Sequence, residues 1–81
     1  MPVTVRLFAR LREIAGSDEL SRPVSGTATV ADVWQEIVAD WPALAPYAGS
    51  LGCAVNAQYA RMTTAVQDGD EVAFLPPVSG G

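Results

Sequence analysis

The sequence predicts an α+β fold, in which a mixed β-sheet carries one long helix packed across one of its faces. Three observations predict it: apolar and polar residues alternate near the N-terminus, residues 30–41 place apolar side chains at helical spacing, and a short apolar segment stands near the C-terminus. The 81 residues allow one small domain, and a hydrophobic content of 49% is sufficient for a core.

The N-terminal part predicts two strands around a short helix. Residues 3–9 alternate apolar and polar side chains at their start, which is typical of a half-buried strand. Residues 10–16 have apolar side chains at helical spacing and predict one or two helical turns, with Gly16 as the C-terminal cap. A weaker strand is expected over residues 19–25, where Pro23 favours the edge of the sheet.

The long helix is the clearest predicted element. Thr29 and Asp32 have the spacing of a capping box. One apolar stripe follows, and it consists of Val30, Val33, Trp34, Ile37, Val38 and Trp41. Burying each such side chain stabilises a fold by about 1.5–3 kcal/mol, so we expect the helix to anchor the core, tryptophans included. Pro42 ends the helix. A small-residue connector is expected over residues 43–52, and a helical turn at residues 43–45 is left open.

The remaining residues predict three more strands, near residues 53–56, from residue 59 onward and over residues 71–75. Turns are expected at residues 56–58 and 68–69. The element order is then strand, short helix, strand, long helix and three strands. With the first and last strands central and parallel, this is the order of a ubiquitin-like β-grasp roll.

Composition excludes several classes of function. A net charge of −4, with five arginines and no lysine, argues against nucleic acid as a partner. It suits plain solubility or a partner with a basic docking surface. Without histidine and with one cysteine, a single chain has neither a His/Cys metal site nor a Ser–His or Cys–His nucleophile pair. We therefore expect no metal and no bound cofactor, and we interpret Cys53 as a small buried residue.

Localisation is expected to be cytoplasmic. No apolar run approaches the roughly 20 residues that span a membrane, so no membrane association is expected. The N-terminus has neither the basic region nor the apolar region of a secretory signal.

The C-terminal residues carry the strongest functional signal, because the sequence ends at Gly80-Gly81. A dipeptide without side chains enters channels too narrow for any other. Pro76-Pro77 removes two ladder donors and favours polyproline II at the root of this arm. We therefore expect a β-grasp domain over residues 1–76 and a flexible tail over residues 77–81 that presents the α-carboxylate of Gly81.

A free carboxylate is a poor electrophile, so a partner must activate it. An acyl-adenylate provides that activation, and a sulfur nucleophile then converts it to a thiocarboxylate. The carrier itself needs no catalytic side chain, and we expect it not to be an enzyme on its own. The alternative is an ordinary frayed terminus whose last two residues happen to be glycine.

Three segments resemble the family of small, sulfur-carrying subunits of molybdopterin synthase. They are Val-Arg-Leu-Phe-Ala-Arg-Leu-Arg-Glu at residues 5–13, Ala-Val-Asn at residues 54–56, and Asp-Gly-Asp-Glu-Val-Ala-Phe-Leu-Pro-Pro-Val-Ser-Gly-Gly at residues 68–81. The terminal segment is the most specific of the three. Residues 17–52 match the family only in pattern, and Leu75 stands where the family commonly has an aromatic residue.

The resemblance implies a role in molybdenum cofactor biosynthesis. An adenylyltransferase resembling ubiquitin-activating enzyme, which uses ATP, would adenylate Gly81, and a sulfurtransferase or cysteine desulfurase would supply sulfur for a Gly81 thiocarboxylate. The tail would then insert into the large subunit of molybdopterin synthase and donate sulfur to cyclic pyranopterin monophosphate, within a heterotetramer that holds two carriers. The inserted residues would be Pro76, Pro77, Val78, Ser79 and Gly80.

The resemblance also implies a docking face beside the root of the tail, formed by Phe8, Arg12, Phe74 and Leu75. For Phe8 and Phe74 the alternative is an ordinary place in the core. For Arg12 the alternative is a solvated position on the short helix.

Two other functions stay open. The same chemistry would serve thiamine thiazole synthesis, tRNA thiolation or conjugation to protein lysines, although the thiamine carriers that the chain resembles are shorter and usually lack the Pro-Pro step. A β-grasp adaptor that binds partners non-covalently would not use its terminus at all.

Overall fold

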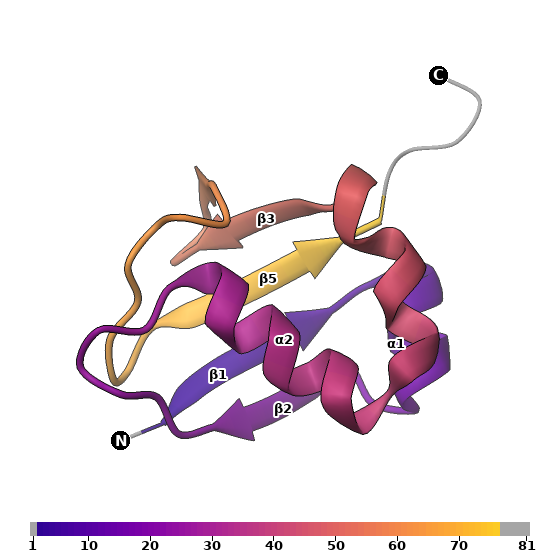
Figure 1. The fold of residues 1–81 in the computed structure, drawn as a ribbon, viewed down its shortest axis with the longest axis horizontal. Coiled ribbons are helices and arrows are strands. Elements are labelled where there is room, and N and C mark those ends of the chain that lie inside the picture. The colour runs from indigo at the N-terminus through magenta and orange to yellow at the C-terminus, as the bar shows by residue number, and fades with distance from the viewer. Residues whose placement is uncertain (1, 77–81) are drawn as a thin grey trace.

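Residues 2–76, the part of the chain that this computed structural model describes, form five strands, two α-helices and one 3₁₀ helix (Figure 1). In chain order the elements are β1 (Val3–Leu7), α1 (Ala9–Ala15), β2 (Glu19–Arg22), α2 (Val30–Asp40), the 3₁₀ helix η1 (Pro42–Ser50), β3 (Gly52–Val55), β4 (Gln58–Ala60) and β5 (Glu71–Leu75). The predicted order of strands and helices is confirmed.

The five strands form one mixed sheet in the order β2-β1-β5-β3-β4. The central pair, β1 and β5, is parallel, and the other neighbours are antiparallel. Val5 lies opposite Leu20 on one side and Val72 on the other. The predicted parallel pairing of the first and last strands is therefore confirmed, and the fold is the ubiquitin-like β-grasp.

The helix α2 lies across one face of this sheet (Figure 1). Its capping box is formed as predicted: the Thr29 backbone N–H donates to Asp32 Oδ2 at 2.9 Å, and the Asp32 N–H donates to Thr29 Oγ1 at 3.4 Å. The helix ends at Asp40, and Trp41 is its C-terminal cap just before Pro42.

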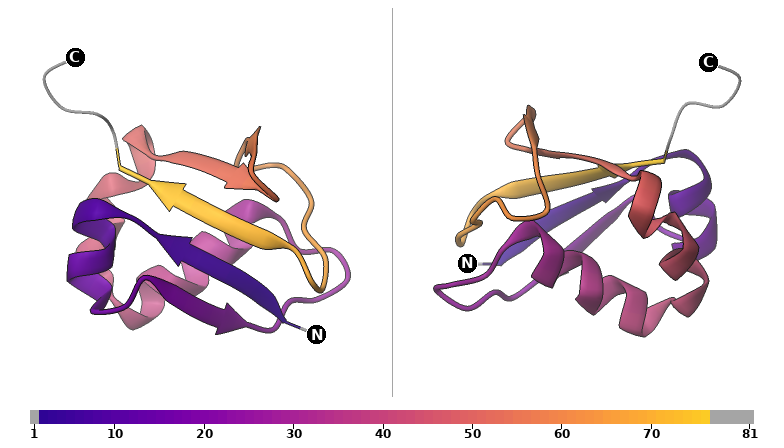
Figure 2. Two further views of the ribbon diagram at one scale, coloured as in Figure 1. Left: turned by 180° about the vertical axis from the view of Figure 1, so that it is seen from behind. Right: turned by 45° about the horizontal axis from the view of Figure 1, so that its top comes forward.

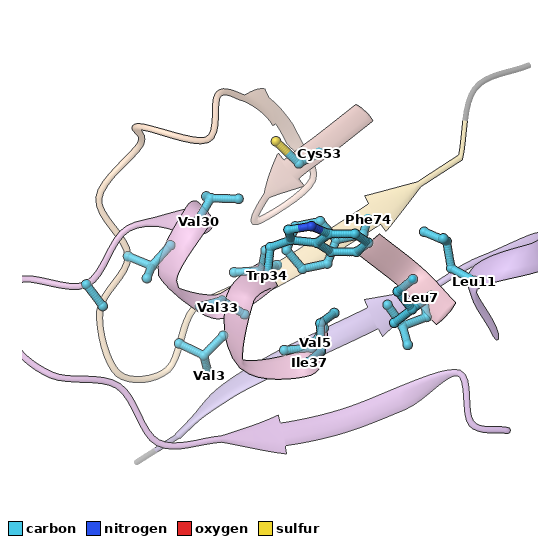
Figure 3. Packing of buried hydrophobic residues seen from close by; sticks show 14 residues of the cluster. Val3, Val5, Leu7, Leu11, Val30, Val33, Trp34, Ile37, Cys53 and Phe74 are labelled. Carbon is cyan, nitrogen blue, oxygen red and sulfur yellow. The ribbon is translucent and has the colours of Figure 1, made fainter. Parts of the chain in front are cut away.

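The core lies between α2 and the sheet (Figure 3). Its centre is an aromatic pair, with the Trp34 and Phe74 ring centroids 5.0 Å apart and the rings tilted by 56°. The apolar stripe of α2 supplies four buried residues, which are Val30, Val33, Trp34 and Ile37. The inward positions of the two central strands supply five more, which are Val3, Val5, Leu7, Val72 and Phe74.

The segment after α2 is more regular than the predicted connector of small residues. Residues 42–50 form the 3₁₀ helix η1, which starts on Pro42 and buries Leu44. A proline at the first helical position loses no hydrogen bond and has the required φ. The short runs Ala-Leu-Ala and Tyr-Ala-Gly show no apolar stripe, so periodicity alone did not reveal the full extent of this helix.

Two strands are shorter than predicted. β1 ends at Leu7 because the chain turns into α1, where Ala9 has a φ of 51°. β2 ends at Arg22, just before Pro23, and it lies at an edge of the sheet as predicted.

The two-residue turn between β3 and β4 has a positive φ at both positions, 51° at Asn56 and 69° at Ala57. Such turns match the twist of an antiparallel hairpin, so this one fixes the register of β4 against β3.

The helices within residues 2–76 lack the length and the apolarity that crossing a membrane requires.

Candidate functional site: the outer face of the sheet

The sheet has an outer face, opposite α2, that no described helix covers (Figure 2, left). Side chains of a strand alternate between its two faces. Because Val5, Leu7, Val72 and Phe74 point into the core, the residues between them point outward. The register then sets one row across this face, formed by Arg6, Ala73, Ala54 and Tyr59.

The middle of this row is shallow and its ends are bulky. Ala73 and Ala54 are small and only partly buried. The exposed large hydrophobic residues of the described chain are Tyr59 at 97% exposure, Phe8 at 41% and Leu75 at 38%. Leu75 follows Ala73 by two positions and therefore shares its face. Leu75 and Phe8 thus lie at the end of β5, where the chain enters the predicted tail, whereas Tyr59 lies on β4, level with the middle of β5.

Arg6 lies at the β1 end of the row. Its guanidinium carbon lies 5.9 Å from the centroid of the Phe8 ring, a cation–π contact. Nη1 of the same side chain lies 3.6 Å from Glu71 Oε2 and 3.9 Å from Glu19 Oε1, on the two neighbouring strands. Phe8 is therefore on the outer side of the sheet, against Arg6.

The helix α1, which directly follows Phe8, adds two exposed arginines. Arg10 pairs with Glu13 at 3.3 Å, and its pKa is raised first by Tyr47 and then by Glu13. Arg12 makes no ion pair with any side chain in the described residues. Although the chain is acidic, this corner therefore offers a cation to a partner.

The predicted site residues divide into three groups. Phe8, Arg12 and Leu75 are exposed around the end of β5, where a docking face was expected. Phe74 is fully buried against Trp34, which corrects its placement on that face and leaves it in the core, the alternative left open for it. Its position in β5 points it inward, because it is two residues from buried Val72.

Among the predicted tail residues, Pro76 is half-buried directly after β5. The others lie outside the described residues, and they are Pro77, Val78, Ser79, Gly80 and Gly81.

Sequence reasoning missed Tyr59, the most exposed apolar residue of the site. The signal was present in the hairpin. A two-residue turn at Asn56-Ala57 places Tyr59 opposite Ala54. Since Cys53 is buried, its neighbour Ala54 and the partner of Ala54 face outward.

Cys53 is buried as predicted, and its Sγ–H donates to the carbonyl oxygen of Ala60 at 3.2 Å. Burial raises the pKa of the Cys53 thiol, so the reactive thiolate is disfavoured at neutral pH. Within residues 2–76 there is no cluster of three or more His, Cys, Asp or Glu side chains with the arrangement of a metal site.

Comparison with known proteins identifies the family of the chain. Residues 5–81 match the ThiS family. The chain is 40% identical to the molybdopterin synthase sulfur carrier subunit of Escherichia coli, over 98% of this chain and 99% of that protein. It is 39% identical to the subunit of the same name from Chlamydomonas reinhardtii, over the full length of both.

A solved structure gives the same result. SAMP1 from Haloferax volcanii superposes with a TM-score of 0.86 at 36% identity, over the full length of both chains. The sequence, the sheet topology and these similarities agree: the chain belongs to the ThiS family of ubiquitin-like sulfur carriers.

Proposed function

We propose that this chain is the sulfur carrier subunit of a molybdopterin synthase. The observation that carries the proposal is its end-to-end similarity, at 39–40% identity, to two subunits of that name. The family match also extends through Gly81, so the Gly-Gly segment lies within the matched region.

The working group in this proposal is the α-carboxylate of Gly81. An adenylyltransferase resembling ubiquitin-activating enzyme transfers AMP from ATP to this carboxylate and releases pyrophosphate. A sulfurtransferase or cysteine desulfurase then supplies a persulfide sulfur, which displaces AMP and, after reductive cleavage of the S–S bond by a thiol, leaves a thiocarboxylate. The chain contributes no side chain to these steps.

In the second stage the carrier docks on the large subunit of molybdopterin synthase. Exposed Phe8 and Leu75 suit this role, because Leu75 ends the strand that leads into the tail and Phe8 directly follows Leu7, the partner of Phe74. Tyr59 extends the same face on β4, level with the middle of β5. Docking there directs residues 77–81 toward the partner, where the thiocarboxylate donates sulfur to cyclic pyranopterin monophosphate. The catalytic side chains belong to the large subunit in this scheme, and two carriers serve a large-subunit dimer.

The composition of the outer face supports its role in docking on the large subunit. Aromatic residues are enriched at the centres of protein interfaces, and a small-residue floor of Ala54 and Ala73 admits a protruding side chain of a partner. Arg12, which has no ion-pair partner within residues 2–76, adds a cation at the rim, which fits an acidic group on the partner surface.

The first experiment follows the mass of the carrier. The chain is incubated with the adenylyltransferase and sulfur donor of the same organism and with ATP. Intact-protein mass spectrometry should then show one oxygen replaced by sulfur at Gly81. A variant lacking Gly81 is the control, and it should fold equally well and stay unmodified. An unchanged mass of the full chain would reject the sulfur-carrier proposal.

The second experiment tests the acceptor. The thiocarboxylated chain is mixed with the large subunit and cyclic pyranopterin monophosphate, and molybdopterin formation is measured. A carrier for thiamine or tRNA thiolation would be thiocarboxylated yet give no molybdopterin here.

The likeness to SAMP1, a small archaeal modifier protein, favours a second candidate function, conjugation to lysines of other proteins. Isopeptide-linked products after activation, trapped from cell extract and mapped by peptide sequencing, would support it. A non-covalent adaptor predicts instead that loss of Gly81 leaves every activity intact.

A further inference from the structure

We propose that Arg6 is a positioning residue for docking, which holds the Phe8 ring in the orientation that the large subunit binds. The inference rests on the proposed function, since it concerns the same face and partner. Arg6 is in the middle of β1 and acts through Phe8 rather than on the sulfur chemistry.

The Phe8 ring is exposed, so its orientation depends on contacts such as the one with Arg6. Its side chain is 41% exposed, and it is the residue between the end of β1 and the first turn of α1. The next residue, Ala9, has a φ of 51°, an unfavourable conformation for alanine that the turn into α1 imposes. The backbone thus fixes where the ring starts, and the Arg6 guanidinium carbon lies 5.9 Å from the ring centroid on the outer face.

Arg6 is itself held from both sides. Glu19 on β2 and Glu71 on β5 both lie within ion-pair distance of its Nη1, so the guanidinium is kept above the sheet. Its Nε is buried and has no hydrogen-bond partner among the described residues. A buried unpaired donor costs stability. The interactions that hold the guanidinium in place are therefore its two ion pairs and its contact with the Phe8 ring.

The chain offers a matched control. Arg22 stacks on Trp41 at 5.8 Å, pairs with Asp40, and likewise has a buried unpaired Nε. This second contact joins β2 to the end of α2 and lies on the inner side of the sheet, because Arg22 is opposite buried Val3. Arg22 and Arg6 thus share one chemistry at two places, of which only the place of Arg6 adjoins the outer face.

The experiment measures binding to the large subunit of molybdopterin synthase from the same organism by isothermal titration calorimetry. The variants are Arg6→Gln, Arg6→Lys, Phe8→Leu, the double variant Arg6→Gln/Phe8→Leu, and Arg22→Gln. Arg6→Gln should raise Kd about two- to fivefold, the size expected of one exposed cation–π contact. Arg6→Lys keeps the cation and should restore most of the affinity.

The double variant decides the mechanism. Because leucine offers no aromatic ring, Arg6→Gln should change Kd little in the Phe8→Leu background. Arg22→Gln should lower the Tm while leaving Kd unchanged. The Tm of every variant is measured beside its Kd, so that a loss of folding is not read as a loss of binding.

Each other result overturns the inference. An unchanged Kd in Arg6→Gln removes any role of Arg6 in docking. An equal rise in Kd with and without the Phe8 ring means that Arg6 contacts the partner directly. Absence of binding by the unmodified chain would reject the proposed function together with this inference, whereas normal binding with an inert Arg6 would reject the inference alone.

Discussion

The two faces of the sheet use the same strands for different purposes. On the inner face, Val72 and Phe74 of β5 are fully buried beneath α2. On the outer face, Ala73 and Leu75 of the same strand remain accessible to a partner. Residues one position apart in β5 therefore lie in opposite environments, one buried in the core and the next accessible on the outer face. This alternation lets a chain of 81 residues hold a core and a binding surface in one sheet.

The sharpest test of the comparison is the neighbouring pair Phe74 and Leu75. Phe74→Ala should destabilise the fold by about 3–5 kcal/mol, because it leaves a cavity beside Trp34. Leu75→Ala should cost about 1 kcal/mol or less, because that side chain is already 38% exposed. Urea denaturation followed by tryptophan fluorescence measures both values. Equal losses would mean that the two faces do not differ as described.

The outer face is tested next through Tyr59. Tyr59→Ala should leave the Tm almost unchanged, because the side chain is 97% exposed. It should raise the Kd for the large subunit about tenfold or more, as an aromatic anchor does. Gln58→Ala, on the preceding position of β4, is the matched control. A normal Kd in Tyr59→Ala would remove this residue from the docking face.

The inner face depends on the start of α2. Thr29→Ala removes the hydroxyl that accepts the Asp32 N–H, and it should cost about 1 kcal/mol of stability. Thr29→Ser keeps the cap and should restore most of it. Because the helix lies on the opposite face of the sheet, the Kd for the large subunit should not change in either variant.

A smaller effect, in this case a gain in stability, is expected at the hairpin that carries Tyr59. Ala57 has a φ of 69°, which glycine adopts without strain. Ala57→Gly should therefore raise the free energy of unfolding by about 0.5–1 kcal/mol. Gln58→Gly, in the adjoining strand, should lower it. Destabilisation by Ala57→Gly, measured by thermal unfolding, would contradict the turn geometry.

The smallest effect concerns Cys53, a titratable group beneath the sheet. Its pKa is raised by burial, so its contribution to stability is complete below the pKa of the unfolded thiol, about 8.5, and declines as pH rises through the folded value. Cys53→Ala should remove this decline. Unfolding curves between neutral and alkaline pH, compared for both proteins, measure it.

Sequence reasoning reached the fold because each main element carries a local signal. The Thr29–Asp32 spacing and the apolar stripe predicted α2, and alternation predicted β1. The site was harder to predict, since whether a residue faces inward depends on strand register. Phe74 and Leu75 adjoin in sequence, and only the pairing of β5 with β1 and β3 separates them. Tyr59 was missed because its orientation follows from the Asn56-Ala57 turn and the register of β4, and not from a pattern within this strand of three residues.

The parallel pairing of β1 with β5 also bears on how the protein is made. Residues near position 5 cannot complete their hydrogen bonds until residues near position 72 have been synthesised. A nascent chain that lacks β5 has an open gap between β1 and β3, so stable folding must wait until β5 has been synthesised. Prematurely terminated chains would then fail to mature, and cellular proteases would clear them before they reach a partner.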